Sequence, residues 1–170
     1  SSLYNRKERM GIYIALGSNL GDKKKNLLQA LQLIEQHGVQ VCKVSDFIRT
    51  RPYGVTDQPD FLNGAAEIAT ALSPEALLTV LLQVEQEMGR KRLRHWGERN
   101  IDLDLLLYED RIINLPQLQL PHPDLQNRSF VLQPLAQIAP EMWHPVLKKT
   151  IGELWQNWQA KHHCVFSAVL

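Results

Sequence analysis

The stretch Arg99-Asn100-Ile101-Asp102-Leu103-Asp104-Leu105-Leu106-Leu107 places two aspartates inside a run of residues that favour burial. Asp102 and Asp104 alternate with apolar residues, and this period of two is typical of a β-strand. Residues two apart on a strand point to the same face of the sheet. We therefore expect both carboxylates to project side by side from an otherwise buried strand.

Two adjacent carboxylates repel each other, and burying them without a partner would cost several kcal/mol. Hard divalent cations, Mg²⁺ above all, suit carboxylate oxygens and commonly bring nucleotide phosphates with them. Asp102 and Asp104 are therefore candidate metal ligands. The alternative is a strand with one solvated face, on which Asp102 and Asp104 pair with nearby arginines. The local pattern alone does not separate the two interpretations.

A basic connector precedes this strand, because Arg90, Arg92, Arg94 and Arg99 surround Trp96. Arginine makes bidentate contacts with phosphate, and a tryptophan face can stack on a base or on a guanidinium. Paired acids beside such a connector are what a metal–nucleotide site requires, since the arginines neutralise the charge that the metal leaves. The plainer alternative is that the arginines are solvated loop charges and the tryptophan is a core anchor.

The composition is that of an ordinary soluble domain, with 170 residues, 44% hydrophobic residues and 22% charged residues. A formal net charge of +1 argues against a generic nucleic-acid binder. Cys42 and Cys164 are too few and too far apart for a disulfide framework or a zinc site, which favours a reducing, cytoplasmic setting. No apolar run is long enough to span a bilayer, and no signal peptide is visible.

The remaining pattern predicts strands and helices in alternation. Asp22 is a candidate helix cap with Gly38 as the stop, and Ser73-Pro74-Glu75 is a strong helix start. Thr150 and Glu153 form a capping box before a last helix. The strands are expected at 11–16, 39–50, 61–71 and 102–108, with a short partner strand at 112–113, and the helices at 22–36, 73–89, from about 128, and from 150.

Strand–helix–strand occurs twice in this order, which suggests a split βαβ unit. We therefore predict a single-domain α/β (α+β) fold, a ferredoxin-like sheet with helices packed on both faces. Residues 1–10 are polar and without periodicity, and are expected to be a flexible leader. Residues 11–158 would form the domain, and residues 159–170, which show no compelling pattern, a C-terminal extension.

Two further groups could carry chemistry. Residues 57–63 offer an aromatic ring and an amide at the mouth of a strand, suited to holding a flat heterocycle, or simply a turn whose phenylalanine packs into the core. His122 lies between two prolines and could contact phosphate together with Arg128. Gly17-Ser18-Asn19-Leu20-Gly21 lacks the Lys-Ser/Thr ending of a P-loop. A nucleophile elbow and a His-Glu-x-x-His metal motif are also absent from the sequence.

Four motifs occur in register: Ala15-Leu16-Gly17-Ser18-Asn19-Leu20-Gly21-Asp22; Thr50-x-Pro52-x-Gly54-x-x-Asp57-Gln58-Pro59-x-Phe61-Leu62-Asn63; His95-Trp96-Gly97-Glu98-Arg99-x-x-Asp102-Leu103-Asp104; and Pro121-His122-Pro123 followed by Arg128-x-Phe130-Val131-Leu132-x-Pro134-Leu135. With them the chain resembles the 6-hydroxymethyl-7,8-dihydropterin pyrophosphokinases over roughly residues 11–158. The resemblance implies transfer of the β,γ-diphosphate of ATP to the hydroxymethyl group of the dihydropterin, with release of AMP, in folate biosynthesis. It also implies a ferredoxin-like fold, two Mg²⁺ ions and a monomer.

The resemblance also implies roles for single residues. Asp102 and Asp104 would bind the metal, and with Arg90 and Arg92 they would form the catalytic set. The pterin pocket would contain Thr50, Pro52, Tyr53, Phe61, Asn63, Trp96 and Phe130. The ATP side would contain Glu85, Arg90, Arg92, Trp96, Arg99, Leu105, His122 and Arg128. His95 stands where an arginine is common in the family and Arg94 lies one residue earlier, which leaves open whether Arg92 or Arg94 reaches the phosphates.

Two functions from other classes remain as alternatives. One is a non-catalytic ferredoxin-like module that binds RNA through residues 90–99, with an affinity that falls steeply with salt and needs no Mg²⁺. The other is a metal-dependent phosphohydrolase that uses the same aspartates with water as the acceptor. We expect small-molecule partners, neither nucleic acid nor membrane.

Overall fold

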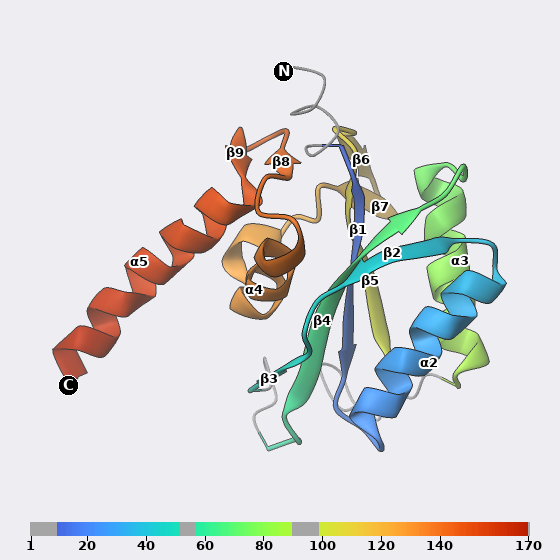
Figure 1. Cartoon of the computed structure of the whole chain (residues 1–170), viewed down its shortest axis with the longest axis horizontal. Coiled ribbons are helices and arrows are strands. Elements are labelled where there is room, and N and C mark those ends of the chain that lie inside the picture. Colours follow the sequence, from blue (N-terminus) through green and yellow to red (C-terminus); the bar gives the residue numbers. More distant parts are fainter. Residues whose placement is uncertain (1–9, 52–56, 90–98, 170) are drawn as a thin grey trace.

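A computed structural model of the chain describes residues 10–51, 57–89 and 99–169. Its main sheet has β1 (Ile12–Ser18) between β4 (Phe61–Ala69) and β5 (Asp102–Tyr108), with β2 (Gln40–Val44) beyond β4 (Figure 1). The short strand β3 (Ile48–Thr50) also pairs with β4, and all of these pairings are antiparallel. The order β2-β4-β1-β5 is that of a ferredoxin-like split βαβ, so the predicted fold is confirmed.

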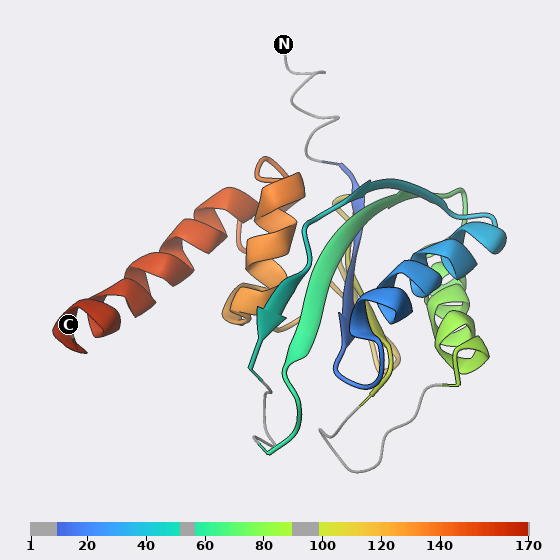
Figure 2. The same cartoon turned by 60° about the horizontal axis from the view of Figure 1, so that its bottom comes forward.

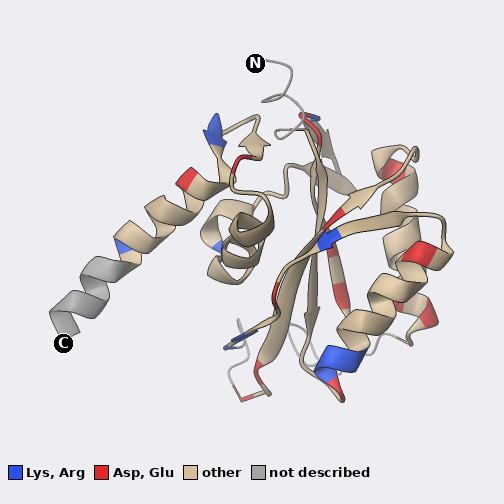
Figure 3. Cartoon of the chain, viewed as in Figure 1, with Lys and Arg blue, Asp and Glu red and all other residues tan. Residues whose placement is uncertain are grey.

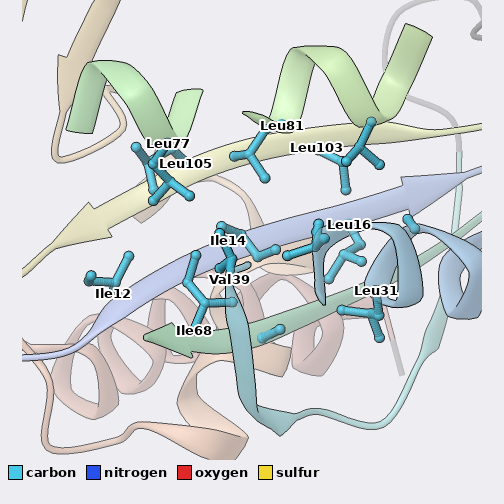
Figure 4. Close-up of a cluster of buried hydrophobic side chains, with 14 of the residues drawn as sticks. Ile12, Ile14, Leu16, Leu31, Val39, Ile68, Leu77, Leu81, Leu103 and Leu105 are labelled. Carbon is cyan, nitrogen blue, oxygen red and sulfur yellow. The ribbon is translucent and has the colours of Figure 1, made fainter. Parts of the chain in front are cut away.

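Helices cover both faces of this sheet, as the sequence predicts. The helices α2 (Lys23–Gln36) and α3 (Pro74–Glu87) lie on one face, and α4 (Ser129–Ile138) lies on the other, next to α5 (Ile151–Val169) (Figures 1 and 2). Each face has its own apolar core. In the first core, Leu77 and Leu81 of α3 meet Leu105 of β5 (Figure 4). Because β1 is covered on both sides, all seven of its residues are buried.

The expected helix caps are present. The Asp22 carboxylate accepts from the Lys25 amide at 3.2 Å, and the Ser73 hydroxyl accepts from the Ala76 amide at the same distance. At the start of α5, the Thr150 hydroxyl accepts from the Glu153 amide while the Glu153 carboxylate accepts from the Thr150 amide. This reciprocal pair is the predicted capping box.

The expected strand at 39–50 is wrong, because it is two strands separated by residues 45–47. The Ser45 hydroxyl accepts from the backbone amide of Ala65 at 2.9 Å and so replaces a bond of the sheet ladder. Phe47 lies against Gly64, where an added Cβ would meet its ring at 2.7 Å. A side-chain acceptor and a close approach at a glycine therefore let the strand bend.

Two other expectations need correction. The partner strand at 112–113 is displaced: β6 (Ile113–Leu115) pairs with β7 (Leu118–Leu120) and not with β5. The region from 159 onward is helical, since α5 continues to Val169 and runs outward from the domain (Figure 2). The remaining elements are the 3₁₀ helix η1 (Leu125–Asn127) and the hairpin of β8 (Trp143–His144) and β9 (Lys149–Thr150).

Charged residues of both signs are spread over the described part of the domain (Figure 3), in agreement with the net charge of +1. Lys24 and Lys25, at the start of α2, are exposed. Within the described ranges, no helix is long and apolar enough to cross a membrane.

Candidate active site

The backbone register aligns predicted site residues in rows across three strands. Asn63 of β4 and Asp102 of β5 are both paired with Gly17 of β1. In the next row on this face, Asp104 is paired with Ala15. The central strand thus carries its two smallest residues beside the carboxylates, with Gly17 between Asn63 and Asp102 and Ala15 next to Asp104. Small residues in the middle of a packed sheet leave space above the sheet, and a pocket can occupy this space.

One hollow on the α4 face of the sheet brings together most of the predicted site residues that the structure describes. Gly17 and Ala15 of β1 line it, as do Phe130 and Val131 at the start of α4. Its lining contains predicted pterin residues (Thr50, Phe61, Asn63 and Phe130), predicted phosphate-side residues (Arg99 and Arg128) and both candidate metal ligands (Asp102 and Asp104). Residues from four separate segments therefore converge as the sequence motifs imply.

The pterin side of this hollow combines the amide of Asn63 with the aromatic rings of Phe61 and Phe130. The Asn63 side chain is buried and donates a hydrogen bond to the Thr50 hydroxyl. Each ring carries a guanidinium over it: Arg99 lies 5.5 Å from the centre of Phe61, and Arg128 lies 5.9 Å from the centre of Phe130. The hollow thus offers flat faces, a directional amide and positive charge to a planar polar ligand.

The two aspartates lie in different electrostatic surroundings. A guanidinium nitrogen of Arg99 is 2.9 Å from Asp102, so this carboxylate has the arginine partner that the plainer interpretation expects. Burial raises the pKa of Asp104 to about 7, and the neighbouring charge of Asp102 adds to the rise. Arg128 opposes the shift, and Glu85 increases it. The protein's own cations therefore leave Asp104 under-compensated, and an added cation would favour its ionised form.

A second hollow shares Asp104 with the first. Its lining includes Asp104, Leu105 and His122, together with residues of the β6–β7 hairpin. Burial, followed by the charge of Arg128, lowers the pKa of His122. The Nδ1 atom of His122 accepts from the Asp124 amide at 3.2 Å, which leaves the proton of the neutral ring on Nε2. The neutral ring can thus donate to a ligand oxygen.

The two aspartates suit the predicted metal. Among residues 10–51, 57–89 and 99–169, no three His, Cys, Asp or Glu side chains gather as a metal cluster. Mg²⁺ does not require such a cluster, because it commonly binds one or two carboxylates and completes its coordination with water and phosphate oxygens. Asp102 and Asp104, on one face of one strand with the raised pKa of Asp104, fit that mode of binding.

Several predicted residues lie outside the described ranges: Pro52, Tyr53, Arg90, Arg92, Arg94, His95 and Trp96. Their assignments stay predictions, and so does the choice between Arg92 and Arg94.

Comparison with known proteins identifies the family. The sequence profile of the 7,8-dihydro-6-hydroxymethylpterin-pyrophosphokinase (HPPK) family matches residues 13–140, about three quarters of the chain. The chain belongs to the HPPK family. A 2-amino-4-hydroxy-6-hydroxymethyldihydropteridine pyrophosphokinase of Haemophilus influenzae is 47% identical over 134 residues, 78% of this chain and 84% of that protein. The corresponding protein of Bacillus subtilis is 49% identical over 131 residues, 76% of this chain and 78% of that protein.

Solved structures share the HPPK fold. A Plasmodium falciparum HPPK-DHPS triple mutant with STZ-DHP superposes with a TM-score of 0.71 at 16% identity, over 88% of this chain and 43% of that chain. The wild-type HPPK-DHPS with pteroate superposes with a TM-score of 0.72, over 88% of this chain and 42% of that chain. This chain therefore spans less than half the length of those HPPK-DHPS chains.

Glu85 of this HPPK-family chain has a partner that the sequence does not indicate. It is 4% exposed, and its Oε2 accepts from the backbone amide of Leu103 at 2.8 Å. Leu103 lies between the two aspartates, so Glu85 ties α3 to the strand that carries them. A direct contact between Glu85 and ATP stays a prediction.

Sequence reasoning assigned no role to Asn19, Gln58 or Val131. Val131 lines the main hollow, and Asn19 and Gln58 are buried and bonded to each other beside it. The signal for Asn19 was a polar residue within a short Gly-flanked turn that directly follows a buried strand.

Proposed function

We propose that this HPPK-family chain transfers the diphosphate of ATP to the hydroxymethyl group of 6-hydroxymethyl-7,8-dihydropterin and releases AMP. The relatives whose names carry this activity are 47% and 49% identical to it. The pterin would bind in the main hollow and the nucleotide in the second hollow.

The observation that carries this assignment is the position of Asp104, which lines both hollows. A group transfer between two substrates requires their reacting ends to meet at one charged point. In the main hollow the residues suit a flat polar ring, and in the second they include a neutral histidine able to donate to an oxygen. The phosphate chain of ATP would pass from the second hollow toward the first across Asp104.

The described residues supply alignment and charge neutralisation, which phosphoryl-type transfer chiefly needs. Phe61 and Phe130 would hold the pterin ring between them, while the Asn63 amide would recognise its polar edge. Arg99 and Arg128 would offset phosphate charge. From the sequence, we propose that Arg90, Arg92 and Trp96 also bind on the nucleotide side, and that Pro52 and Tyr53 complete the pterin pocket.

Asp102 and Asp104 would hold Mg²⁺, in the two-ion form that the family resemblance implies. When bound, Mg²⁺ would neutralise phosphate oxygens and help to activate the pterin hydroxyl. His122 would donate from Nε2 to a phosphate oxygen. The localisation in the cytoplasm, the monomeric state and the absence of nucleic-acid partners stay predictions.

Product identity tests the proposal directly. The purified chain is incubated with ATP and Mg²⁺, with and without the dihydropterin, and adenine nucleotides are separated by chromatography. AMP that forms only with the dihydropterin present supports the assignment. ADP, or AMP formed without the pterin, would indicate a hydrolase or another kinase. RNA binding that persists without Mg²⁺ and weakens steeply with salt would favour the RNA-binding alternative.

A further inference from the structure

Asn19 lies just after the central strand β1, and its side chain is fully buried. Its amide nitrogen donates to the side-chain oxygen of Gln58 at 2.8 Å and to the backbone oxygen of Pro59 at 3.1 Å. Its amide oxygen accepts from the backbone amide of Arg99 at 2.9 Å. One side chain thus joins three segments that are distant in the sequence.

The backbone of Asn19 strengthens the link to Arg99. The Asn19 amide donates to the Arg99 carbonyl oxygen at 3.0 Å, so the two residues are joined by a pair of reciprocal bonds. Asn19, Gln58 and Arg99 are all buried. An unmade hydrogen bond costs more in such surroundings than it does at the surface. Arg99 is therefore held by its own backbone, independently of what its side chain does.

The side chain of Arg99 leads directly into the candidate site. Its guanidinium contacts the Asp102 carboxylate at 2.9 Å and lies over the Phe61 ring at 5.5 Å. These two residues belong to the metal side and the pterin side of the hollow, respectively. Phe61 also follows Pro59 by two residues, so both ends of the Arg99–Phe61 contact start from backbone that Asn19 holds.

We propose that Asn19 is a positioning residue that sets the place of the Arg99 guanidinium between Asp102 and Phe61. The kinetic consequences of this inference rest on the proposed function. The anchor, by which we mean the hydrogen bonds of Asn19 to Arg99 and to residues 58–59, does not depend on that function. Asn19 touches no substrate in this account, and it acts only through Arg99 and residues 58–59. Functional groups need such supporting bonds because small displacements of a reacting geometry are costly.

The test compares Asn19→Ala with Asn26→Ala. Asn26 is the matched control, because its amide nitrogen donates to the Ser18 hydroxyl and to the Leu20 carbonyl oxygen of the same connection. Neither bond involves Gln58, Pro59 or Arg99. We expect Asn19→Ala to lower kcat/KM by at least about tenfold, given that misplacement by 1 Å can cost about a hundredfold. Asn26→Ala should keep kcat/KM within about threefold. Equal losses in the two variants would overturn the proposal.

A double-mutant cycle with Arg99→Ala separates positioning from general destabilisation. If Asn19 acts through the Arg99 side chain, Asn19→Ala should add little to the loss that Arg99→Ala already causes. Losses that multiply would contradict the proposal.

Amide hydrogen exchange gives a readout that does not depend on catalysis. The Arg99 amide should exchange slowly in the wild type and in Asn26→Ala, and much faster in Asn19→Ala. If the Arg99 amide exchanged as slowly in Asn19→Ala as in the wild type, the proposal that Asn19 anchors Arg99 would be wrong. If the wild-type chain formed no dihydropterin-dependent AMP while the Arg99 amide still responded to Asn19→Ala, the proposed function would fail and the anchor would stand.

Discussion

The Asn63 side chain donates a hydrogen bond to the Thr50 hydroxyl, and this bond joins β4 to the last residue of β3. It turns the amide oxygen of Asn63 toward β1, where it lies 2.9 Å from the place that a Cβ on Gly17 would occupy. The amide that would recognise the pterin thus donates to the Thr50 hydroxyl on one side, and on the other side its oxygen occupies space that Gly17 leaves free because it has no side chain.

This arrangement makes Gly17→Ala an informative change. The new methyl group would push the Asn63 oxygen aside, and overpacking of this kind costs about 1–3 kcal/mol. We expect the KM for the dihydropterin to rise by about tenfold or more, with the KM for ATP nearly unchanged. Gly38→Ala is the contrast: its φ of +84° penalises a side chain, so it should lower stability without changing either KM. A KM for the dihydropterin that stayed at its wild-type value in Gly17→Ala would argue against the placement of Asn63.

Removing either candidate metal ligand should abolish most turnover. We expect Asp102→Ala and Asp104→Ala each to lower kcat by about a hundredfold or more, the scale of a lost electrostatic contact in a transition state. Asp110→Ala removes an exposed aspartate just beyond the same strand and should leave kcat unchanged. Near-normal kcat for an Asp102 or Asp104 variant at saturating Mg²⁺ would remove the metal assignment.

The raised pKa of Asp104 predicts a pH-dependent stability of the metal-free protein. The folded state holds the proton up to a pKa of about 7, whereas the usual value is 3.8. The stability associated with this proton is fully present below pH 3.8 and is lost as the pH rises through about 7. Without metal, Asp104→Asn should therefore raise Tm by several degrees at pH 8 and hardly change it near pH 4. Thermal unfolding in the presence of a chelator measures this difference, and an equal Tm at pH 8 would count against a raised pKa.

Glu85→Gln should shift the pH dependence of cation binding. The charge of Glu85 raises the pKa of Asp104, so its removal should allow a divalent cation to bind at lower pH, while the glutamine oxygen can still accept from Leu103. Titration with Mn²⁺ at a series of pH values measures the midpoint, which is the pH at which cation binding reaches half of its maximum. Glu87→Gln, on the same helix but paired with His37 at 2.8 Å, should leave that midpoint in place.

A stop codon after Trp158 tests the role of the C-terminal extension. The ring of Trp158 stacks on the rings of Trp155 and His162, with ring centres 5.6 Å and 3.7 Å apart, respectively. The helix α5 is therefore continuous through Trp158. The family match ends at residue 140, and we expect the shortened chain to keep its kcat and KM values while losing some thermal stability. A large loss of kcat without loss of fold would assign the extension a part in the reaction.

The sequence predicts the elements with strong local signals. Alternation around Asp102 and the caps at Asp22 and Ser73 act within a few residues, so the strand β5 and the helices α2 and α3 follow from them. The break at Ser45 does not, because it depends on Ala65 and Gly64 of another strand, which no local pattern reports. The full length of α5 is not predicted by the sequence analysis, although Trp155, Trp158 and His162 have helical spacing.

The candidate site, too, can be predicted only in part from the sequence. The residue types of the pocket follow from the family motifs, whereas the anchoring of Arg99 by Asn19 joins segments 80 residues apart and requires the folded chain. The pKa of Asp104 likewise depends on burial and on the distant Glu85.

The row Asn63–Gly17–Asp102 has a consequence for substrate length. Neighbouring strands lie about 4.8 Å apart, so the backbones that carry Asn63 and Asp102 are separated by about 10 Å, a gap held by ladder hydrogen bonds. The distance between these two backbones is therefore fixed by the sheet, and no single side-chain replacement can increase it. A pterin whose alcohol arm was extended by one carbon would overshoot this gap, and it should bind yet react poorly.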